Sequence, residues 1–171
     1  MKGALLAAAV VAAAPAAGDR AGLTAEEARR ALQHSPLPPP PADTSNARSD
    51  DAAAARLGQF LFFEKRLSGD GRFSCASCHD PARGFTDGRA LSAGVGPGRR
   101  NTPALWNVAY NRWFFWDGRA DSLWSQALKP LESRDEMAGG RDRIHRLFRD
   151  DRDLRAAYEA VFGPFPEGAD R

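Results

Sequence analysis

The amino-acid sequence predicts a mainly α fold with long loops and little or no β structure. Apolar residues recur at helical spacing in several segments, and no stretch of useful length alternates between apolar and polar residues. The 171 residues include 16 glycines and 12 prolines, above the average combined share of about 12%. The length suits one domain with a core and a small appendage.

The net charge limits the kinds of binding partner, and the N-terminal segment indicates the cell compartment. The formal net charge is +2, with both signs mixed along the chain, which argues against binding of nucleic acid. Lys2 precedes an apolar run at 4–14 that is too short to cross a bilayer, and small residues follow it. We expect residues 1–17 to be a cleaved export signal and the compartment to be a bacterial periplasm. An uncleaved anchor or a frayed alanine-rich helix are the alternatives.

Helix-start signals place the first elements. Thr24 and Glu27 predict a capping box for a short helix at 23–32. A proline-rich extended arm follows, because proline cannot donate to a helix, so residues 18–49 hold a short helix and an arm.

A longer helix is expected at 50–66. Asp50 or Asp51 stands at its start, where a carboxylate caps free amides and faces the positive end of the helix dipole. Its apolar face consists of three residues at helical spacing: Leu57, Phe60 and Leu61.

The second half of the chain predicts a long loop and then a helix. The loop covers 81–101, which is rich in glycine and arginine. Asp121 or Ser122 caps the following helix. Pro130 is expected to kink or end that helix near Gln126, because proline lacks an amide and clashes with the carbonyl four residues back.

Two further helical stretches close the predicted domain. They carry apolar residues at helical spacing within 144–148 and 154–162. The main domain is therefore expected to span 50–162. Residues 163–171 are then a truncated tail or the start of a connection to another domain.

The only two cysteines stand in the segment SCASCHDP, with a histidine directly after the second one. A structural zinc site needs four ligands, and His34 and His145 do not form the second pair. A redox dithiol is typical of a βαβ setting, and a disulfide leaves the adjacent histidine unexplained. Covalent haem c explains all three residues: Cys75 and Cys78 bind the vinyl groups, and His79 is the proximal iron ligand.

The sixth iron ligand decides between an electron carrier and a reaction centre. Carriers usually fill both axial positions, often with His and Met. His34 lies in the arm, His145 is flanked by charges and is expected at the surface, and Met137 lies in a loop. None has an evident ligand setting, so an open or water-bound iron that reacts with peroxide is expected. Side chains that could line the haem, or form ordinary core, are Phe60, Leu61, Phe73 and Phe85.

Several further blocks accompany the cysteine motif, among them LGQFLFFEKRLSGDGRF, RNTPALWNVAY and NRWFFWDGRADSLWSQALKPLESRDEM. Together, over roughly residues 35–163, they resemble the N-terminal haem domain of the bacterial di-haem cytochrome c peroxidase family. That family includes methylamine-utilisation type enzymes that cross-link tryptophans. Several separate blocks make this resemblance far more specific than the haem motif alone.

The resemblance implies roles for individual residues besides the three of the haem motif. Trp116 would lie between two haems and relay electrons. Gln126 and Glu136 would line the side of the haem where peroxide reacts. Asn101 matches a position that binds calcium near the junction of the two domains.

These residue types suit peroxide chemistry. Cleavage of the O–O bond needs a base that takes a proton from one oxygen and returns it to the leaving oxygen, which a carboxylate at Glu136 can do. Gln126 can orient peroxide but cannot exchange protons. Without the resemblance, Glu136 is a solvated loop carboxylate and Trp116 a core aromatic. Asp117 and Arg119 are expected to brace the Trp116 loop with hydrogen bonds.

Two departures from the family pattern matter. The peroxidase branch has a histidine in a GH pair where this sequence has Gly94 and Val95. Valine cannot bind iron, so a five-coordinate or water-bound haem that needs no reductive activation is expected. The second haem motif of the family is missing before the chain ends at FGPFPEGADR. We expect a fragment of a longer protein, or else a partner haem on another chain.

The sequence therefore predicts a periplasmic c-type haem peroxidase domain that reduces hydrogen peroxide to water. Electrons would come from a second haem domain and a small periplasmic cytochrome c or cupredoxin. Calcium and a homodimer are further options. The alternatives are a di-haem oxidase that modifies a protein substrate, a single-haem electron-transfer cytochrome c, and a degenerate domain that binds no haem.

Overall fold

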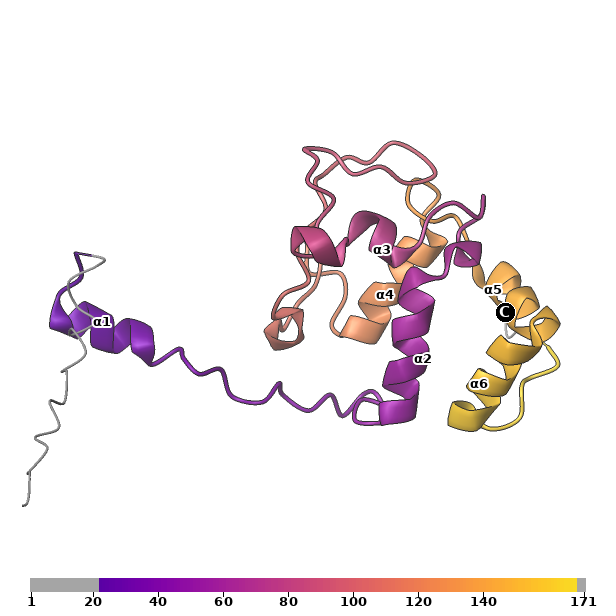
Figure 1. Ribbon diagram of the computed structural model, residues 1–171, viewed down its shortest axis with the longest axis horizontal. Helices are drawn as coiled ribbons and strands as arrows, with labels where there is room; N and C mark the ends of the chain where they lie inside the picture. The colour runs from indigo at the N-terminus through magenta and orange to yellow at the C-terminus, as the bar shows by residue number, and fades with distance from the viewer. Residues whose placement is uncertain (1–21, 169–171) are drawn as a thin grey trace, which may run out of the picture. The chain divides into compact units, whose positions relative to one another are not determined.

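The computed structural model describes residues 22–168 as helices joined by long loops, and no strand forms within this range (Figure 1). The mainly α class is therefore confirmed. The expected export signal at 1–17 lies outside the described residues. The chain divides into two compact units, Met1–Pro39 and Pro40–Arg171. Of the helices between residues 22 and 168, none is both long and apolar enough to cross a membrane.

The first unit contains the short helix α1, Ala25–Leu32. The Thr24 hydroxyl accepts a hydrogen bond from the Glu27 amide, and the Glu27 carboxylate accepts one from the Thr24 amide. This is the capping box that the sequence predicts. The helix buries no residue, so its caps rather than a core define its ends.

The second unit is built around α2, Ala52–Phe63. Asp51 accepts hydrogen bonds from the free amides of Ala53 and Ala54 in the first turn, which confirms it as the cap. Leu57 is buried and Leu61 packs against the core, whereas Phe60 is 56% exposed. The expected apolar face is wrong at Phe60, because the core contacts the side of α2 that carries the other two residues.

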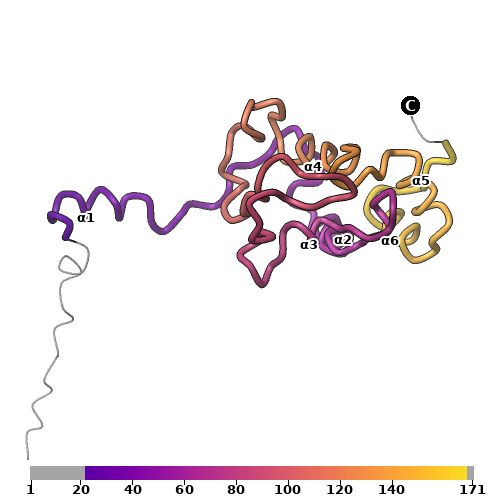
Figure 2. Tube along the Cα trace, turned by 90° about the horizontal axis from the view of Figure 1, so that it is seen from above, coloured from indigo at the N-terminus to yellow at the C-terminus, as the bar shows by residue number. Residues whose placement is uncertain are grey.

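Helices α5, Arg141–Asp150, and α6, Arg152–Phe162, pack against each other, and α6 also contacts α2. Both views show α2 between this pair and the long loops (Figures 1 and 2). The core between these helices consists of Phe148, Leu154 and Phe165, with Leu61, Ile144, Leu147 and Tyr158 around it. Packing thus continues past 162, into the segment that the sequence assigns to the tail.

The remaining helix of this unit, apart from the cysteine turn, is α4, Leu123–Glu132, and the Ser122 hydroxyl caps it. The expected end near Gln126 is wrong, because α4 continues with Pro130 inside it. The following loop folds back onto the end of the helix. The Met137 amide donates to the Pro130 carbonyl at 3.1 Å, which satisfies a carbonyl of the last turn.

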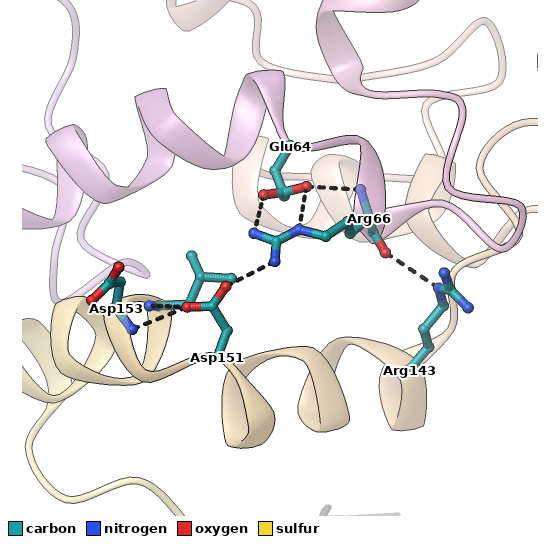
Figure 3. A network of polar contacts seen from close by, with 6 residues as sticks. Glu64, Arg66, Arg143, Asp151 and Asp153 are labelled. Atoms are coloured by element: carbon teal, nitrogen blue, oxygen red, sulfur yellow. Dashed lines mark hydrogen bonds and ion pairs between the residues drawn. The ribbon is translucent and has the colours of Figure 1, made fainter.

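A network of charged side chains joins the end of α2 to the α5–α6 pair (Figure 3). Arg66, in the 3-10 turn η2 (Lys65–Leu67), contacts Glu64 at 2.6 Å and Asp151 at 2.8 Å. The Arg143 side chain donates to the Arg66 carbonyl at 3.2 Å. The turn that leads toward the cysteine motif is therefore tied to the C-terminal helices.

Candidate haem-attachment site

The cysteine motif forms a single helical turn, α3, Cys75–Cys78, which contacts α2. Ser74 precedes it, and the Ser77 hydroxyl accepts a hydrogen bond from the Ser74 amide at 2.9 Å. The two cysteines are half-buried and are not joined to each other. His79 follows directly, and its amide donates to the Cys75 carbonyl at 2.8 Å. Both thiols and the imidazole are therefore held by one short, closed turn.

The ring of His79 is oriented by the backbone. Its Nδ1 atom lies 3.1 Å from the carbonyl oxygen of Phe85. A carbonyl can only accept, so Nδ1 carries the hydrogen and Nε2 keeps the free lone pair that a metal ligand needs. A tight loop supports the carbonyl: Phe85 has φ 60° after a left-handed Gly84, and its amide donates to the Asp80 carbonyl at 2.8 Å.

Both cysteines stand as neutral thiols at neutral pH. Burial raises the pKa of the Cys75 thiol. Burial also raises the pKa of Cys78, and the negative charges of Asp87 and Glu136 raise it further. A thioether forms when a thiol adds across a vinyl double bond, and both cysteines are free for that reaction.

A row of aromatic rings borders the loop that orients His79. Phe63 contacts Phe62 at 5.3 Å between ring centroids, Phe62 contacts Phe85 at 6.4 Å, and Phe85 contacts Trp106 at 5.2 Å. Both ends of the row are exposed, with Phe63 at 53% and Trp106 at 66%. Exposed aromatic surface of this kind favours an apolar ligand against it. Leu61, also expected there, packs against the α5–α6 core.

These observations fit covalent haem c. Two thiols on one turn, an imidazole with Nε2 free and an exposed aromatic row are what the group requires. The zinc alternative finds no support, since no three His, Cys, Asp or Glu side chains between residues 22 and 168 gather into a metal centre. Cys75, Cys78 and His79 are the residues that would hold the haem.

Glu136 and Gln126 lie on one continuous segment, formed by α4 and the loop after it. Gln126 is half-buried in the first turns of α4, and Glu136 is exposed in the loop. The negative charge of Glu136 is one of the smaller causes of the raised pKa of the Cys78 thiol, after burial and Asp87. The catalytic roles of these two residues stay predictions.

Trp116 lies at the tip of a narrow loop in which Phe114 pairs with Ala120. The expected brace is confirmed: Arg119 contacts Asp117 at 2.8 Å. The Arg119 guanidinium also covers the ring of Phe115 at 3.6 Å. Trp116 itself is 85% exposed and is not the core aromatic of the alternative interpretation.

The other residues considered as ligands of iron or calcium have different surroundings. Met137 is buried at 5% exposure. His145 is half-buried rather than a free surface residue: its Nε2 lies 3.0 Å from the Pro166 carbonyl, and its ring packs against Phe165. Asn101 is exposed, and calcium binding there stays a prediction.

Two contributors to the site were not predicted. The carbonyl of Phe85 gives no signal in a sequence, because every residue has one; only the preceding Gly84 hints at a special backbone. Asp87 has a buried Oδ2 atom without a hydrogen-bond partner. It lines a polar hollow beside the cysteine turn together with Phe73, Ser77, Asp80, Arg83, Arg89 and Ala93.

Comparison with known proteins places the chain in a family. The family described as "Di-haem cytochrome c peroxidase" matches residues 52–171. The methylamine utilization protein MauG of Paracoccus denitrificans is 40% identical over 149 residues, covering 74% of this chain and 38% of that protein. The cytochrome c551 peroxidase of Nitrosomonas europaea is 37% identical over 116 residues, covering 67% of this chain and 35% of that protein.

Solved structures agree with the sequence matches. A MauG-like protein associated with microbial copper homeostasis superposes with a TM-score of 0.67 at 35% identity, covering 78% of this chain and 39% of the other. The diheme peroxidase BthA from Burkholderia thailandensis gives a TM-score of 0.60 at 35% identity, covering 67% and 33%. The chain thus spans less than half the length of these relatives. It belongs to the di-haem cytochrome c peroxidase family.

Proposed function

We propose that the chain is the peroxide-reactive haem domain of an exported c-type haem peroxidase, which reduces hydrogen peroxide to water. The observation that carries the proposal is the link between Glu136 and the haem-attachment turn through one short loop: the Val95 amide donates to the Glu136 carbonyl at 2.8 Å, and the Cys78 sulfur lies 3.5 Å from the Ala93 carbonyl oxygen. A residue whose carboxylate can exchange protons is therefore held near the haem-attachment turn. Membership of a family that includes named peroxidases supports the same reaction class.

Haem c, when attached, supplies a redox-active iron to the site. His79 presents Nε2 to it, because its Nδ1 is bonded to the Phe85 carbonyl. Glu136 takes a proton from one oxygen of hydrogen peroxide and delivers it to the other, which leaves as water. Gln126 donates a hydrogen bond that orients the peroxide. Two electrons and two protons convert each peroxide into two waters.

The proposal also includes a source of electrons and a cell compartment. A second haem domain would deliver electrons at Trp116, whose exposed indole is available for contact with another domain. That domain would draw them from a small periplasmic cytochrome c or cupredoxin. The signal-like residues 1–17 support export to the periplasm.

Glu136→Gln tests the proposal, because glutamine keeps the shape of the side chain but cannot exchange a proton. The rate of Soret change after mixing haem-loaded protein with peroxide is expected to fall by about 10²–10⁴-fold. Glu132→Gln is the matched control: it changes an exposed carboxylate at the end of α4, and glutamine can still accept from Arg141. The control should react at the wild-type rate.

Two results would speak against the proposal. If Glu136→Gln reacts as fast as the wild type, the proton is moved by another group. If the wild type shows no Soret change with peroxide, a single-haem electron carrier is the better description. A preparation without covalent haem would favour a domain that only binds partners.

A second candidate is a di-haem oxidase that modifies a protein substrate. The 40% identity with MauG favours it, as does Val95 at the position of the family's iron-capping histidine. Its site would be the same, but the electrons would come from side chains of the substrate protein. Peroxide consumption without a reduced donor, together with a mass change in an added protein, distinguishes it from the peroxidase.

A further inference from the structure

Residues 92–100, here called the glycine loop, form a narrow loop next to the haem-attachment turn. The Ser92 amide donates to the Arg100 carbonyl at 2.8 Å, and the Gly98 amide donates to the Ser92 carbonyl at 3.1 Å. Ala93 pairs with Pro97 across the loop. The tip of the loop is therefore the segment 94–96.

This tip is bonded to the backbone of Glu136 and its neighbour. The Val95 amide donates to the Glu136 carbonyl at 2.8 Å, and the Gly96 amide donates to the Asp135 carbonyl at 3.0 Å. The Glu136 amide donates to the Ser133 carbonyl at 3.2 Å. Both backbone polar groups of Glu136 are thus engaged, which fixes the point from which its side chain starts.

The same loop contacts the haem-attachment turn. The Cys78 sulfur lies 3.5 Å from the carbonyl oxygen of Ala93. The thiol proton is lost when a thioether forms, so this contact marks proximity and not a lasting hydrogen bond. Only Gly94 separates the contact at Ala93 from the bond of Val95 to Glu136, so the loop is a short bridge between Cys78 and Glu136.

The bridge leaves no room for side chains on its glycines. A Cβ atom at Gly94 would lie 2.5 Å from the carbonyl oxygens of both Asp135 and Glu136, and 2.8 Å from the Glu136 Cα. These are backbone atoms, which cannot rotate away. A Cβ at Gly96 would meet the Asp135 carboxylate at 2.9 Å and its Cα at 3.1 Å. The carboxylate can move, so this second clash is milder.

We propose that Gly94 and Gly96 are positioning residues that let the glycine loop hold Glu136 at a fixed place relative to the haem-attachment turn. The inference rests on the proposed function, since it takes the Glu136 carboxylate to be the group that transfers the proton. The Gly94–Val95 pair then has a role of its own, which is to hold the backbone of Glu136. The glycine loop acts through its backbone hydrogen bonds, which support the side of the site where peroxide would react.

A graded set of alanine variants tests the brace. Gly94→Ala places a Cβ against backbone, Gly96→Ala places one mainly against a side chain, and Gly58→Ala is the control, with open space around it in α2. All are made in the haem-loaded protein. Haem content, the unfolding midpoint, hydrogen exchange of the Val95 and Gly96 amides, and steady-state peroxide kinetics are measured for each.

Gly94→Ala is expected to retain covalent haem and to exchange the Val95 and Gly96 amides about tenfold faster or more. Its kcat should fall on the order of 10²-fold, because a displacement near 1 Å has that effect on a positioned group. KM should change much less. Gly96→Ala should show the same pattern weakly. Gly58→Ala should match the wild type in haem content, amide exchange and kinetics, and its unfolding midpoint should be equal or slightly higher because alanine favours a helix over glycine.

Wild-type exchange and wild-type kcat in Gly94→Ala would overturn the inference. So would a lowered unfolding midpoint with unchanged kcat, because the loop would then serve stability alone. If Gly94→Ala does not fold, Gly96→Ala decides by the same criteria. If the wild type does not react with peroxide, the proposed function fails, while the amide exchange rates still show whether the loop fixes the Glu136 backbone.

Discussion

Single residues at this site are positioned mainly by backbone atoms. His79 is oriented by the Phe85 carbonyl, and Glu136 is anchored by its own amide and carbonyl. The Glu136 side chain remains exposed. This arrangement leaves the carboxylate free to turn, as the proposed proton transfer requires, while the backbone to which it is attached stays in place.

Gln126→Leu separates orientation from proton transfer. Leucine keeps the approximate size of the side chain and the helix, but it removes the hydrogen-bond donor. The rate constant of the reaction with peroxide is expected to fall about 3–10-fold, the effect of one hydrogen bond. The pH dependence of the rate should not change, because glutamine does not titrate. Stopped-flow measurement of the Soret band across pH checks both statements.

The control for this variant is Gln59→Leu, at an exposed position of α2. It should leave the rate unchanged. A loss in Gln126→Leu as large as that in Glu136→Gln would contradict a role limited to orientation.

At the scale of elements, helix starts could be read from the sequence and long-range contacts could not. Thr24, Asp51 and Ser122 cap their helices as predicted, because capping depends only on residues a few positions away. The end of α4 was missed. The helix continues through Pro130, and the loop at 133–140 folds back onto its last turn. That return is a tertiary contact without a local signal.

The charged network around Arg66 is a contact between elements whose strength should depend on pH. Arg66 lowers the pKa of Glu64 by a hydrogen bond. The pKa of Asp151 is lowered first by the Leu154 amide and then by Arg66. Carboxyl groups with a lowered pKa in the folded state add stability above their ordinary pKa. That stability is lost as the pH falls through the folded pKa.

Arg66→Gln should therefore lower the thermal unfolding midpoint of the haem-loaded protein by about 1–4 °C at pH 7. The difference from the wild type should shrink as the pH falls below the ordinary carboxyl pKa of 4.5 for glutamate, because the wild type then loses the same interactions. Scanning calorimetry from pH 7 to about pH 3 covers the range in which carboxyl groups titrate.

The matched control is Arg149→Gln. Arg149 pairs with its neighbour Asp150 within α5, and that pair joins no other element. The unfolding midpoint of Arg149→Gln should be closer to that of the wild type than the midpoint of Arg66→Gln is. A constant midpoint difference for Arg66→Gln at every pH would contradict the electrostatic account and favour a packing role.

At the scale of the whole molecule, the described domain exposes aromatic and aliphatic surface. Trp106 and Trp116 are exposed at 66% and 85%. Some of this surface borders the haem-attachment turn, as the contact of Trp106 with Phe85 shows. The chain covers only about two fifths or less of the length of these relatives.

The sequence predicted the haem motif and the family because both depend on residues in fixed blocks. It could not predict that the loop of Gly94 and Val95 is bonded to Glu136, because 40 residues separate them in the chain. Likewise, Phe60 was expected in the core by its spacing alone, and only the positions of α5 and α6 decide which side of α2 is covered.

Trp116→Phe tests whether the exposed indole serves contact with a second haem domain. The Asp117–Arg119 pair and the stacking of Arg119 on Phe115 shape the loop without help from the indole, so the variant should fold and retain haem. The single-turnover reaction with peroxide should match the wild type. Steady-state turnover with a separately produced second haem domain and a reduced donor cytochrome should fall about tenfold or more, as for aromatic anchors of interfaces.

Trp113→Phe is the control, since it removes another exposed indole three residues earlier. The control should change turnover little. If both variants lose turnover equally, general aromatic contact explains the effect; if neither does, electrons enter elsewhere. Because peroxide chemistry and electron delivery are measured separately on the same protein, a loss confined to Trp116→Phe assigns the indole to delivery.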